Sequence, residues 1–269
     1  VTSIDSYTFE DCTGLTSITI PDSVTSIGDG VFRYCSGLKS VIIGNGVTDM
    51  GEDVFDDCTE LTDLVIGNGI TSIENNAFSG FANLTNVTIG SSVESIGDCA
   101  FCDCTSLKSI TLPDSVTSIG YGAFVNCIEL ANIEISKNIS DIGEAAFANC
   151  INLKVVKLPK SIKTIGEYAF GYYYDEENDA IAKVSDFVIH GFTGTVAESY
   201  ANKNGFVFAP HTEKEIKDEK TGITIIIPGT YGKDVELNVV PVTSGEVSDA
   251  LNSEKSNFKK SLFDITTTI

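Results

Sequence analysis

The feature that most constrains this chain is a 23-residue repeat, which runs without an insertion from the N-terminus to about residue 170. Phenylalanine returns every 23 residues, and from Cys12 to Cys150 a cysteine follows three positions later in every unit except one, where Phe81 takes its place. Such a strict period is not needed for a single globular core, but it is expected for a stack of similar units. The phenylalanine column consists of Phe9, Phe32, Phe55, Phe78, Phe101, Phe124, Phe147 and Phe170.

Each unit reads L-x-x-I-x-I-P/G-x-x-V-x-x-I-G-x-x-A-F-x-x-C. The I-x-I segment alternates with period two and predicts a strand, and the following Pro or Gly predicts a bend. The V-x-x-I segment predicts a second short extended stretch. The glycine after it is expected to turn the chain at positive φ, and the A-F segment to form one short helical turn. These glycines are Gly28, Gly51, Gly97, Gly120, Gly143 and Gly166.

One unit cannot bury its apolar side chains by itself, so successive units are expected to stack at the strand spacing of about 4.8 Å. About seven full rungs then give a curved rod roughly 35 Å long. The predicted fold class is therefore a solenoid, rich in β-structure with short helical turns.

The repeat resembles that of the BspA-like leucine-rich-repeat family of bacterial cell-surface proteins, which reads L-x-x-I-x-L-P-x-x-L-x-x-I-G-x-x-A-F-x-x-C. The resemblance covers roughly residues 1–170 and fixes about nine positions in every 23. It implies a right-handed α/β leucine-rich-repeat superhelix on a secreted or surface-anchored protein. It also implies binding to matrix proteins, other cells or glycans, and it brings no catalytic residues with it.

The repeat is interrupted after Phe170. If Ile189 fills the second strand column, whose regular position is 181, the insertion has eight residues within 172–179. A short helix should follow, with Thr195 and Glu198 as a capping box and Gly205 beyond its end. With a strand at 206–208, this unit resembles the C-terminal cap of the same family. The solenoid is thus predicted to span 1–210, with its cap at 171–210.

The remaining residues divide into a charged segment, 211–221, expected to be a linker, and a β-rich segment, 222–269. The second contains alternating runs at 223–227 and 235–240 around a Pro-Gly turn. With 48 residues (222–269) it is marginal as an independent domain, and it could be the first part of a β-sandwich. At the other end, Val1 lies inside a repeat, so a preceding cap and targeting segment are expected.

The net charge of −21, from 17 basic and 38 acidic residues, disfavours nucleic acid and anionic lipid as partners. Residues 1–104 hold 16 acidic and 2 basic side chains, whereas residues 105–170 hold 6 of each. The acidic half could bind Ca²⁺ or a cationic partner, but a solubilising surface is the favoured interpretation. The sequence lacks the spacing of a dedicated calcium loop, and no apolar run is long enough for membrane insertion.

The cysteine column predicts buried free thiols, because Phe81 shows that the position requires an apolar side chain. Cys99, Cys102 and Cys104 are close in sequence, but no histidine is near to complete a metal site. A Cys99–Cys102 disulfide remains an alternative. Neither histidine of the chain (His190 and His211) lies near a nucleophile in the repeat frame, and no nucleotide-binding or hydrolase motif occurs. No enzyme activity, metal or cofactor is therefore expected.

The candidate binding residues are those whose side chains point outward from the predicted strands, because the apolar columns on either side point inward. Ile42 and Val65 would form a small apolar patch, although β-branched residues also suit any strand. An inserted tyrosine run, Tyr172, Tyr173 and Tyr174, could stack on sugars or pack against the cap. The outward residues are Ser40, Ile42, Asp63, Val65, Asn86, Thr88, Ser109 and Thr111.

These features favour a non-catalytic binding or adhesion module that recognises a protein or glycan on the strand face. We expect a monomer located outside the cell or on its surface. Two alternatives remain, a structural spacer and an accessory module of a larger extracellular enzyme.

Overall fold

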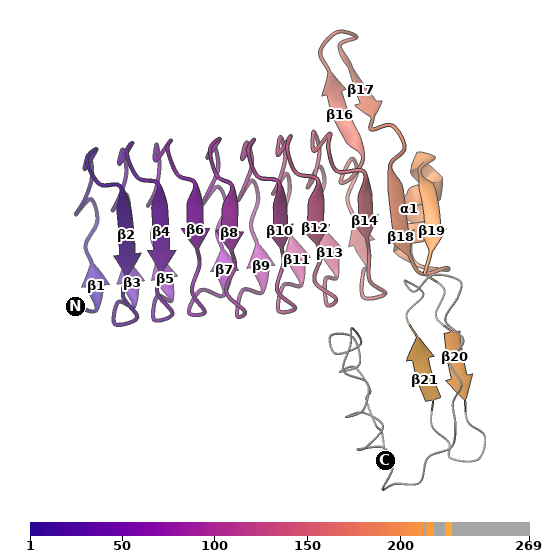
Figure 1. Ribbon diagram of the computed structural model, residues 1–269, viewed down its shortest axis with the longest axis horizontal. Coiled ribbons are helices and arrows are strands. Elements are labelled where there is room, and N and C mark those ends of the chain that lie inside the picture. Colours follow the sequence, from indigo (N-terminus) through magenta and orange to yellow (C-terminus); the bar gives the residue numbers. More distant parts are fainter. Residues whose placement is uncertain (212–213, 218–223, 228–269) are drawn as a thin grey trace, which may run out of the picture. The chain divides into compact units, whose positions relative to one another are not determined.

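The computed structural model describes residues 1–211, 214–217 and 224–227. The chain divides into two compact units, Val1–Pro210 and His211–Ile269. The first unit is a parallel β-solenoid of about nine turns with very little helix, which confirms the predicted fold class (Figure 1). Among the described residues, no helix is long and apolar enough to cross a membrane.

Each I-x-I segment forms one strand of a parallel front stack, in which neighbouring strands pair 23 residues apart. In β4, Val41 and Ile43 are buried and Ile42 is exposed, as the two-residue period of a strand requires. The ladder is continuous from β2 to β8, β10 pairs with β12, and β14 continues through β18 to β19. The repeat strands of this stack are β2 (Ser17–Ile20), β4 (Ser40–Ile43), β6 (Asp63–Val65), β8 (Asn86–Thr88), β10 (Ser109–Thr111), β12 (Asn132–Glu134) and β14 (Val155–Lys157).

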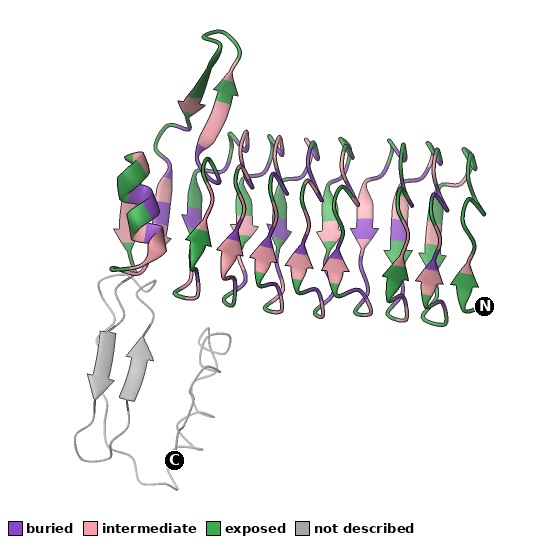
Figure 2. Ribbon diagram, turned by 180° about the vertical axis from the view of Figure 1, so that it is seen from behind, coloured by how far each residue is buried: buried purple, intermediate pink, exposed green. Residues whose placement is uncertain are grey.

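Each V-x-x-I segment contributes a two-residue strand to a back stack, seen in Figure 2. This stack is continuous from β1 to β5 and again from β7 to β15, but β5 and β7 do not pair. Its strands are β1 (Ser3–Ile4), β3 (Ser26–Ile27), β5 (Asp49–Met50), β7 (Ser72–Ile73), β9 (Ser95–Ile96), β11 (Ser118–Ile119), β13 (Asp141–Ile142) and β15 (Thr164–Ile165).

The core between the stacks is built from the repeat columns. Phenylalanine rings from Phe32 to Phe170 are fully buried and stack on one another, with ring centroids 5.4 Å apart for Phe101 and Phe124. Each buried cysteine of the repeat column donates a hydrogen bond to a phenylalanine carbonyl of the preceding turn, as Cys58 does to Phe32 at 3.2 Å. All eight cysteines are free, so the alternative of a Cys99–Cys102 disulfide is not supported. Burial raises the pKa of the Cys58 thiol to about 12.

The turn that carries each phenylalanine is not the short helical turn expected from the sequence. In the second turn, two separate i→i+3 hydrogen bonds form, from Arg33 N to Gly30 O and from Cys35 N to Phe32 O, each at 3.1 Å. Gly30 and Tyr34 have φ values of 56° and 60°. Residues with positive φ cannot continue a right-handed helix, so the chain forms two tight turns.

The repeat glycine is not at positive φ either, which corrects the second expectation for this segment. Gly28 is absent from the residues with positive φ, and the left-handed position falls two residues later, at Gly30. Glycine is needed instead because the turns approach each other closely. A Cβ at Gly28 would lie 2.5 Å from Ser6 N, and one at Gly120 would lie 2.7 Å from Asp98 N.

The insertion after Phe170 forms an antiparallel hairpin of β16 (Tyr172–Asp175) and β17 (Ala180–Lys183). The regular stack resumes with β18 (Val188–Gly191), in which Ile189 pairs with Val156. Ile189 therefore occupies the first strand column, not the second. It follows Val156 by 33 residues instead of 23, so the insertion has ten residues and the predicted eight is wrong.

The cap consists of β18, α1 (Val196–Asn204) and β19 (Val207–Pro210), which pairs with β18. Thr195 is the N-cap residue and Gly205 ends the helix with φ 67°, as predicted. The predicted capping box does not form. Glu198 accepts a hydrogen bond from Gly194 N at 2.7 Å, and the Thr195 hydroxyl makes no cap hydrogen bond with the helix.

The described part of the second unit contains two antiparallel strands, β20 (Lys214–Lys217) and β21 (Thr224–Ile227). The first of these lies within 211–221 and the second within 222–269. The expected strand at 235–240 and the remainder of the possible β-sandwich lie outside the described residues.

Candidate binding surfaces

The predicted outward residues all lie on the front stack and are exposed or half-buried. Pairing of β4, β6 and β8 aligns them in two rows, one polar and one that begins with the apolar Ile42 and Val65. β10, which carries Ser109 and Thr111, lies beside β8 but belongs to a separate hydrogen-bonded ladder. The polar row consists of Ser40, Asp63, Asn86 and Ser109, and the other row of Ile42, Val65, Thr88 and Thr111.

Hydrogen bonds between neighbouring strands hold the polar row in place. Asp63 accepts a hydrogen bond from the Thr62 hydroxyl at 2.6 Å and another from the Asn86 amide at 2.7 Å. These two bonds hold the pKa of Asp63 below its usual value. In the other row, the Thr111 hydroxyl donates to Glu134 at 3.3 Å. The polar row therefore presents a fixed carboxylate and fixed amide groups.

A groove of about 340 Å³ runs along the second row at the ends of the front strands. Ile42, which is 40% exposed, lines it together with Val65 and Thr88. The turns that border the groove carry glycine, because a Cβ at Gly67 would lie 2.5 Å from Gly44 O. The same close packing of turns thus leaves the groove free of bordering side chains.

The three tyrosines of the hairpin have different surroundings. Tyr172 packs edge-on against Phe206 with ring centroids 5.3 Å apart, and its hydroxyl donates to Asn204 at 2.9 Å. Tyr173 is partly buried against the core, whereas Tyr174 is 50% exposed and its hydroxyl bonds to Asp179. Two of the three side chains therefore pack against the protein, and Tyr174 is the one most available to a ligand.

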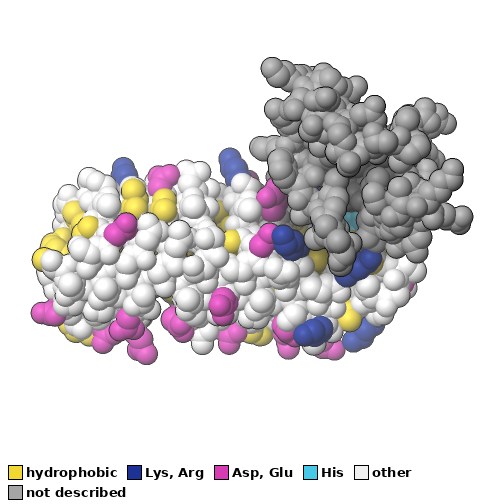
Figure 3. All heavy atoms as spheres, turned by 90° about the horizontal axis from the view of Figure 1, so that it is seen from below, with side chains coloured by type: hydrophobic (Ala, Val, Ile, Leu, Met, Phe, Trp, Pro, Cys, Tyr) yellow, Lys and Arg dark blue, Asp and Glu magenta, His cyan; other side chains and the backbone are white. Residues whose placement is uncertain are grey.

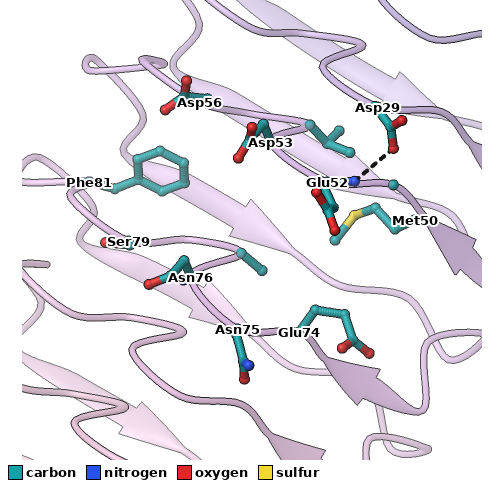
Figure 4. Close-up of a pocket in the computed structure, with 13 residues that line it drawn as sticks. Asp29, Met50, Glu52, Asp53, Asp56, Glu74, Asn75, Asn76, Ser79 and Phe81 are labelled. Atoms are coloured by element: carbon teal, nitrogen blue, oxygen red, sulfur yellow. Dashed lines mark hydrogen bonds between the residues drawn. The ribbon is translucent and has the colours of Figure 1, made fainter.

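Sequence reasoning missed a cleft of about 990 Å³ in the back of the solenoid. It lies between the turn that follows β5 and the turn that follows β7 (Figure 4). Asp29, Glu52, Asp53 and Asp56 face it from one side, and Glu74, Asn75, Asn76, Ser79 and Phe81 line the other.

Two departures from the repeat explain why the solenoid opens here. Glu74 occupies the glycine column, where a Cβ at Gly51 or Gly97 would lie within 2.7 Å of the preceding turn. Phe81 occupies the cysteine column with a much larger ring, and it is buried. Both side chains need space that a regular step does not have. The signal was visible in the sequence as two exceptions within one repeat.

The phenylalanine stack records the same opening. The Phe55 and Phe78 rings are 6.2 Å apart and inclined by 28°, whereas Phe32–Phe55 and Phe101–Phe124 are 5.4 Å apart and inclined by 5°. On the front side, β4, β6 and β8 remain fully paired across the same turns. The cleft is therefore a one-sided opening of an otherwise continuous stack.

Among the described residues, every charged side chain that lines the cleft is a carboxylate, and no lysine, arginine or histidine lines it. Arg33 forms an ion pair with Asp56 at 3.1 Å, and within the described chain the other four carboxylates of the lining form no such pair. In the part of the chain that the structure describes, no three His, Cys, Asp or Glu side chains converge closely enough to hold a metal ion. Figure 3 shows acidic side chains along one edge of the solenoid, with basic side chains concentrated toward its C-terminal end.

Comparisons with known proteins agree with the observed architecture. The model of the BspA type leucine rich repeat region matches residues 2–92 and 71–178, in six copies. A leucine-rich repeat protein from Bacteroides ovatus is 37% identical over 60% of this chain, with a TM-score of 0.54, and this chain covers 41% of its length. The T. pallidum leucine-rich repeat protein is 27% identical over 63% of this chain and 80% of its own, with a TM-score of 0.53. No curated protein matches the chain.

Proposed function

Because the chain belongs to the BspA-type leucine-rich-repeat family, we propose that it is a non-catalytic module that binds a protein or glycan through its front stack. In this proposal the protein works outside the cell or on its surface, as a monomer. The chain spans 41% of the Bacteroides ovatus protein, so a longer protein could carry further modules.

The observation that carries this proposal is the regular row of exposed side chains on the paired strands β4, β6 and β8. A ligand that follows the stack meets an apolar groove at Ile42 and Val65 beside the ordered polar row of Asp63 and Asn86. An apolar strip beside fixed hydrogen-bonding groups is the usual composition of a specific binding surface.

The proposal can be tested on arrays of extracellular matrix proteins and glycans. Ile42→Glu places a charge in the groove. It should abolish saturable binding of any array ligand that binds the wild-type chain. Ile128→Glu is the matched control, because Ile128 is 39% exposed, close to the 40% of Ile42, and lies outside the front stack. Equal binding by the two variants would overturn the assignment of the front stack. No ligand for the wild-type chain would favour the structural spacer.

A further inference from the structure

We propose that the cleft between β5 and β7 binds an extended, basic polypeptide segment, which enters as an added β-strand. This site is on the back of the solenoid and is separate from the front stack to which the proposed function refers. The inference rests on unpaired backbone groups, on the separation of the two strands and on the charge of the lining.

Among the described repeats, a set of backbone hydrogen bonds is missing only at this step. At regular steps the amide after the back strand donates to the preceding turn, as Gly51 N does to Ile27 O and Gly97 N does to Ile73 O, both at 2.8 Å. The corresponding bond from Glu74 N to Met50 O is not formed among the described residues. Both residues line the cleft, and the two groups lack their ladder partner.

The turns on either side of the cleft lose their bonds in the same way. Phe32 N donates to Val54 O at 2.8 Å, and Phe78 N donates to Ala100 O at 2.9 Å. Within the described chain, Phe55 N makes no such bond to Ala77 O. The amides of Asp53 and Asp57 also lack the bonds that their counterparts form in other turns. Both walls of the cleft therefore offer donors and acceptors, as the edges of strands do.

The walls lie farther apart than paired strands do. No Cα atom of β5 lies within 8 Å of a Cα atom of β7. Paired strands are about 4.8 Å apart, so an inserted strand that pairs with both neighbours needs roughly twice that distance. The front strands β4, β6 and β8 remain paired, which holds the two walls at a fixed opening. A preformed slot of this kind lowers the ordering cost of strand addition.

The charge and the apolar contacts of the lining favour a segment whose side chains are basic on one face and small or apolar on the other. Glu52, Asp53 and Glu74 provide negative charge, while Val54 and Phe81 provide apolar contact. The carboxylates are spread along the cleft and do not converge, since no metal-sized cluster forms among the described residues. Lysine or arginine at alternate positions of an extended strand would place several cations along one face, opposite such a distribution.

The test uses the full 269-residue chain and a fluorescent Lys-Thr repeat peptide of about eight residues, the upper part of the usual strand length. Anisotropy at low ionic strength should show saturable binding that weakens with added salt. A Glu-Thr peptide of the same length should not bind. A Lys-Thr peptide with N-methyl groups at alternate amides should bind roughly tenfold more weakly, because it cannot complete the ladder.

The decisive variant is the double substitution Glu74→Gly with Phe81→Cys, which restores the repeat at both exceptional positions. It should close the cleft and weaken peptide binding by about tenfold or more, while it raises the melting temperature. Glu74→Gln is the charge control. It keeps a side chain that holds the cleft open, so the affinity should fall only about two- to fivefold, as for a single exposed ion pair.

Hydrogen exchange supplies a readout at the backbone itself. Peptide binding should slow exchange of the Phe55 and Glu74 amides in the wild-type chain, and those amides should already be protected in the unliganded double variant. Three results would overturn the proposal: no saturable binding to the wild-type chain, equal binding to the double variant, or equal binding of the N-methylated peptide. The third would indicate attraction by charge alone.

Discussion

The step between β5 and β7 differs from the step between β9 and β11 mainly in the residues that set how closely the turns approach. Both steps keep buried phenylalanine and leucine at the same repeat positions, although the half-buried Met50 replaces isoleucine in the back-strand column. At the regular step Gly97 and Gly120 allow the turns to touch, whereas Glu74 prevents this at the other. Hydrophobic columns therefore align the turns, while glycine and cysteine set how closely they stack.

The front and back of the open step provide a second contrast. On the front, an amide ladder crosses the step without a break, because Asn68 N donates to Asn45 at 3.0 Å and Ser91 N donates to Asn68 at 2.7 Å. On the back, Glu52 N donates to the Asp29 carboxylate at 3.0 Å (Figure 4). Among the described residues, Asn75 N donates no equivalent bond to the Glu52 side chain. The front therefore acts as the fixed side of the opening.

The largest expected effect compares phenylalanines at the two kinds of step. Phe101→Ala should reduce the free energy of unfolding by about 3–5 kcal/mol, as for other buried phenylalanine truncations. Phe55→Ala should cost about 1 kcal/mol less, since one of its two ring contacts is already widened to 6.2 Å. Urea denaturation followed by circular dichroism measures both. Equal losses would show that the wider ring spacing carries no energetic weight.

A regular step can be converted into an open one. Gly120→Glu places a Cβ 2.7 Å from Asp98 N and should open the back of the stack as Glu74 does. We expect a loss of about 2–4 kcal/mol, because several backbone hydrogen bonds worth about 1 kcal/mol each are broken together. Hydrogen exchange should locate the damage at the amides of 99–103 and 120. Damage spread evenly over the solenoid would contradict the wedge mechanism.

The reverse change should stabilise the chain. Glu74→Gly restores close approach, and its regained hydrogen bonds outweigh the backbone entropy cost of glycine, for a net gain of about 1 kcal/mol. Glu74→Ala is the matched control, because it removes the charge but keeps the Cβ that meets the neighbouring turn. A gain of equal size from alanine would identify charge repulsion, and not steric wedging, as the cause of the opening. Thermal melts of the three proteins distinguish these cases.

The sequence predicted the solenoid, its strands and the outward columns because the repeat averages the same signal over many turns. It did not predict features that occur once. The cleft lies where Glu74 and Phe81 both replace the usual repeat residues, and the sequence shows them only as exceptions. Their effect on the spacing of the turns follows only from how neighbouring turns pack. The position of Ile189 was wrong by two residues because the hairpin before it has no periodic partner to fix its register. The glycine column was identified correctly, but its cause is close approach and not positive φ.

Substitutions on the front stack should cost far less than those between turns. Thr111→Ala removes a hydrogen bond of 3.3 Å to Glu134 on an exposed surface and should cost well under 1 kcal/mol. Comparison with Phe101→Ala in the same denaturation experiment tests whether the inward and outward faces are assigned correctly. Similar losses from the two variants would mean that they are not.

The smallest expected effect on stability concerns the front of the step between β5 and β7, where the strands remain paired. Asp63 in β6 accepts hydrogen bonds from Thr62 and from Asn86 in β8, and these bonds lower its pKa in the folded state. A carboxyl group whose pKa is lower in the folded than in the unfolded chain adds stability above its ordinary pKa of about 3.9. That contribution is lost as the pH falls through the lower, folded-state value.

Asp63→Asn should therefore be less stable than wild type near neutral pH, by a few tenths of a kcal/mol at this exposed position. The difference should vanish in acid, and a difference that persists at low pH would assign it to packing. Asp63 joins β6 to β8 on the front of the step. If the front and back are held independently, protonation of Asp63 should not change the hydrogen-exchange rate of the Phe55 amide on the back.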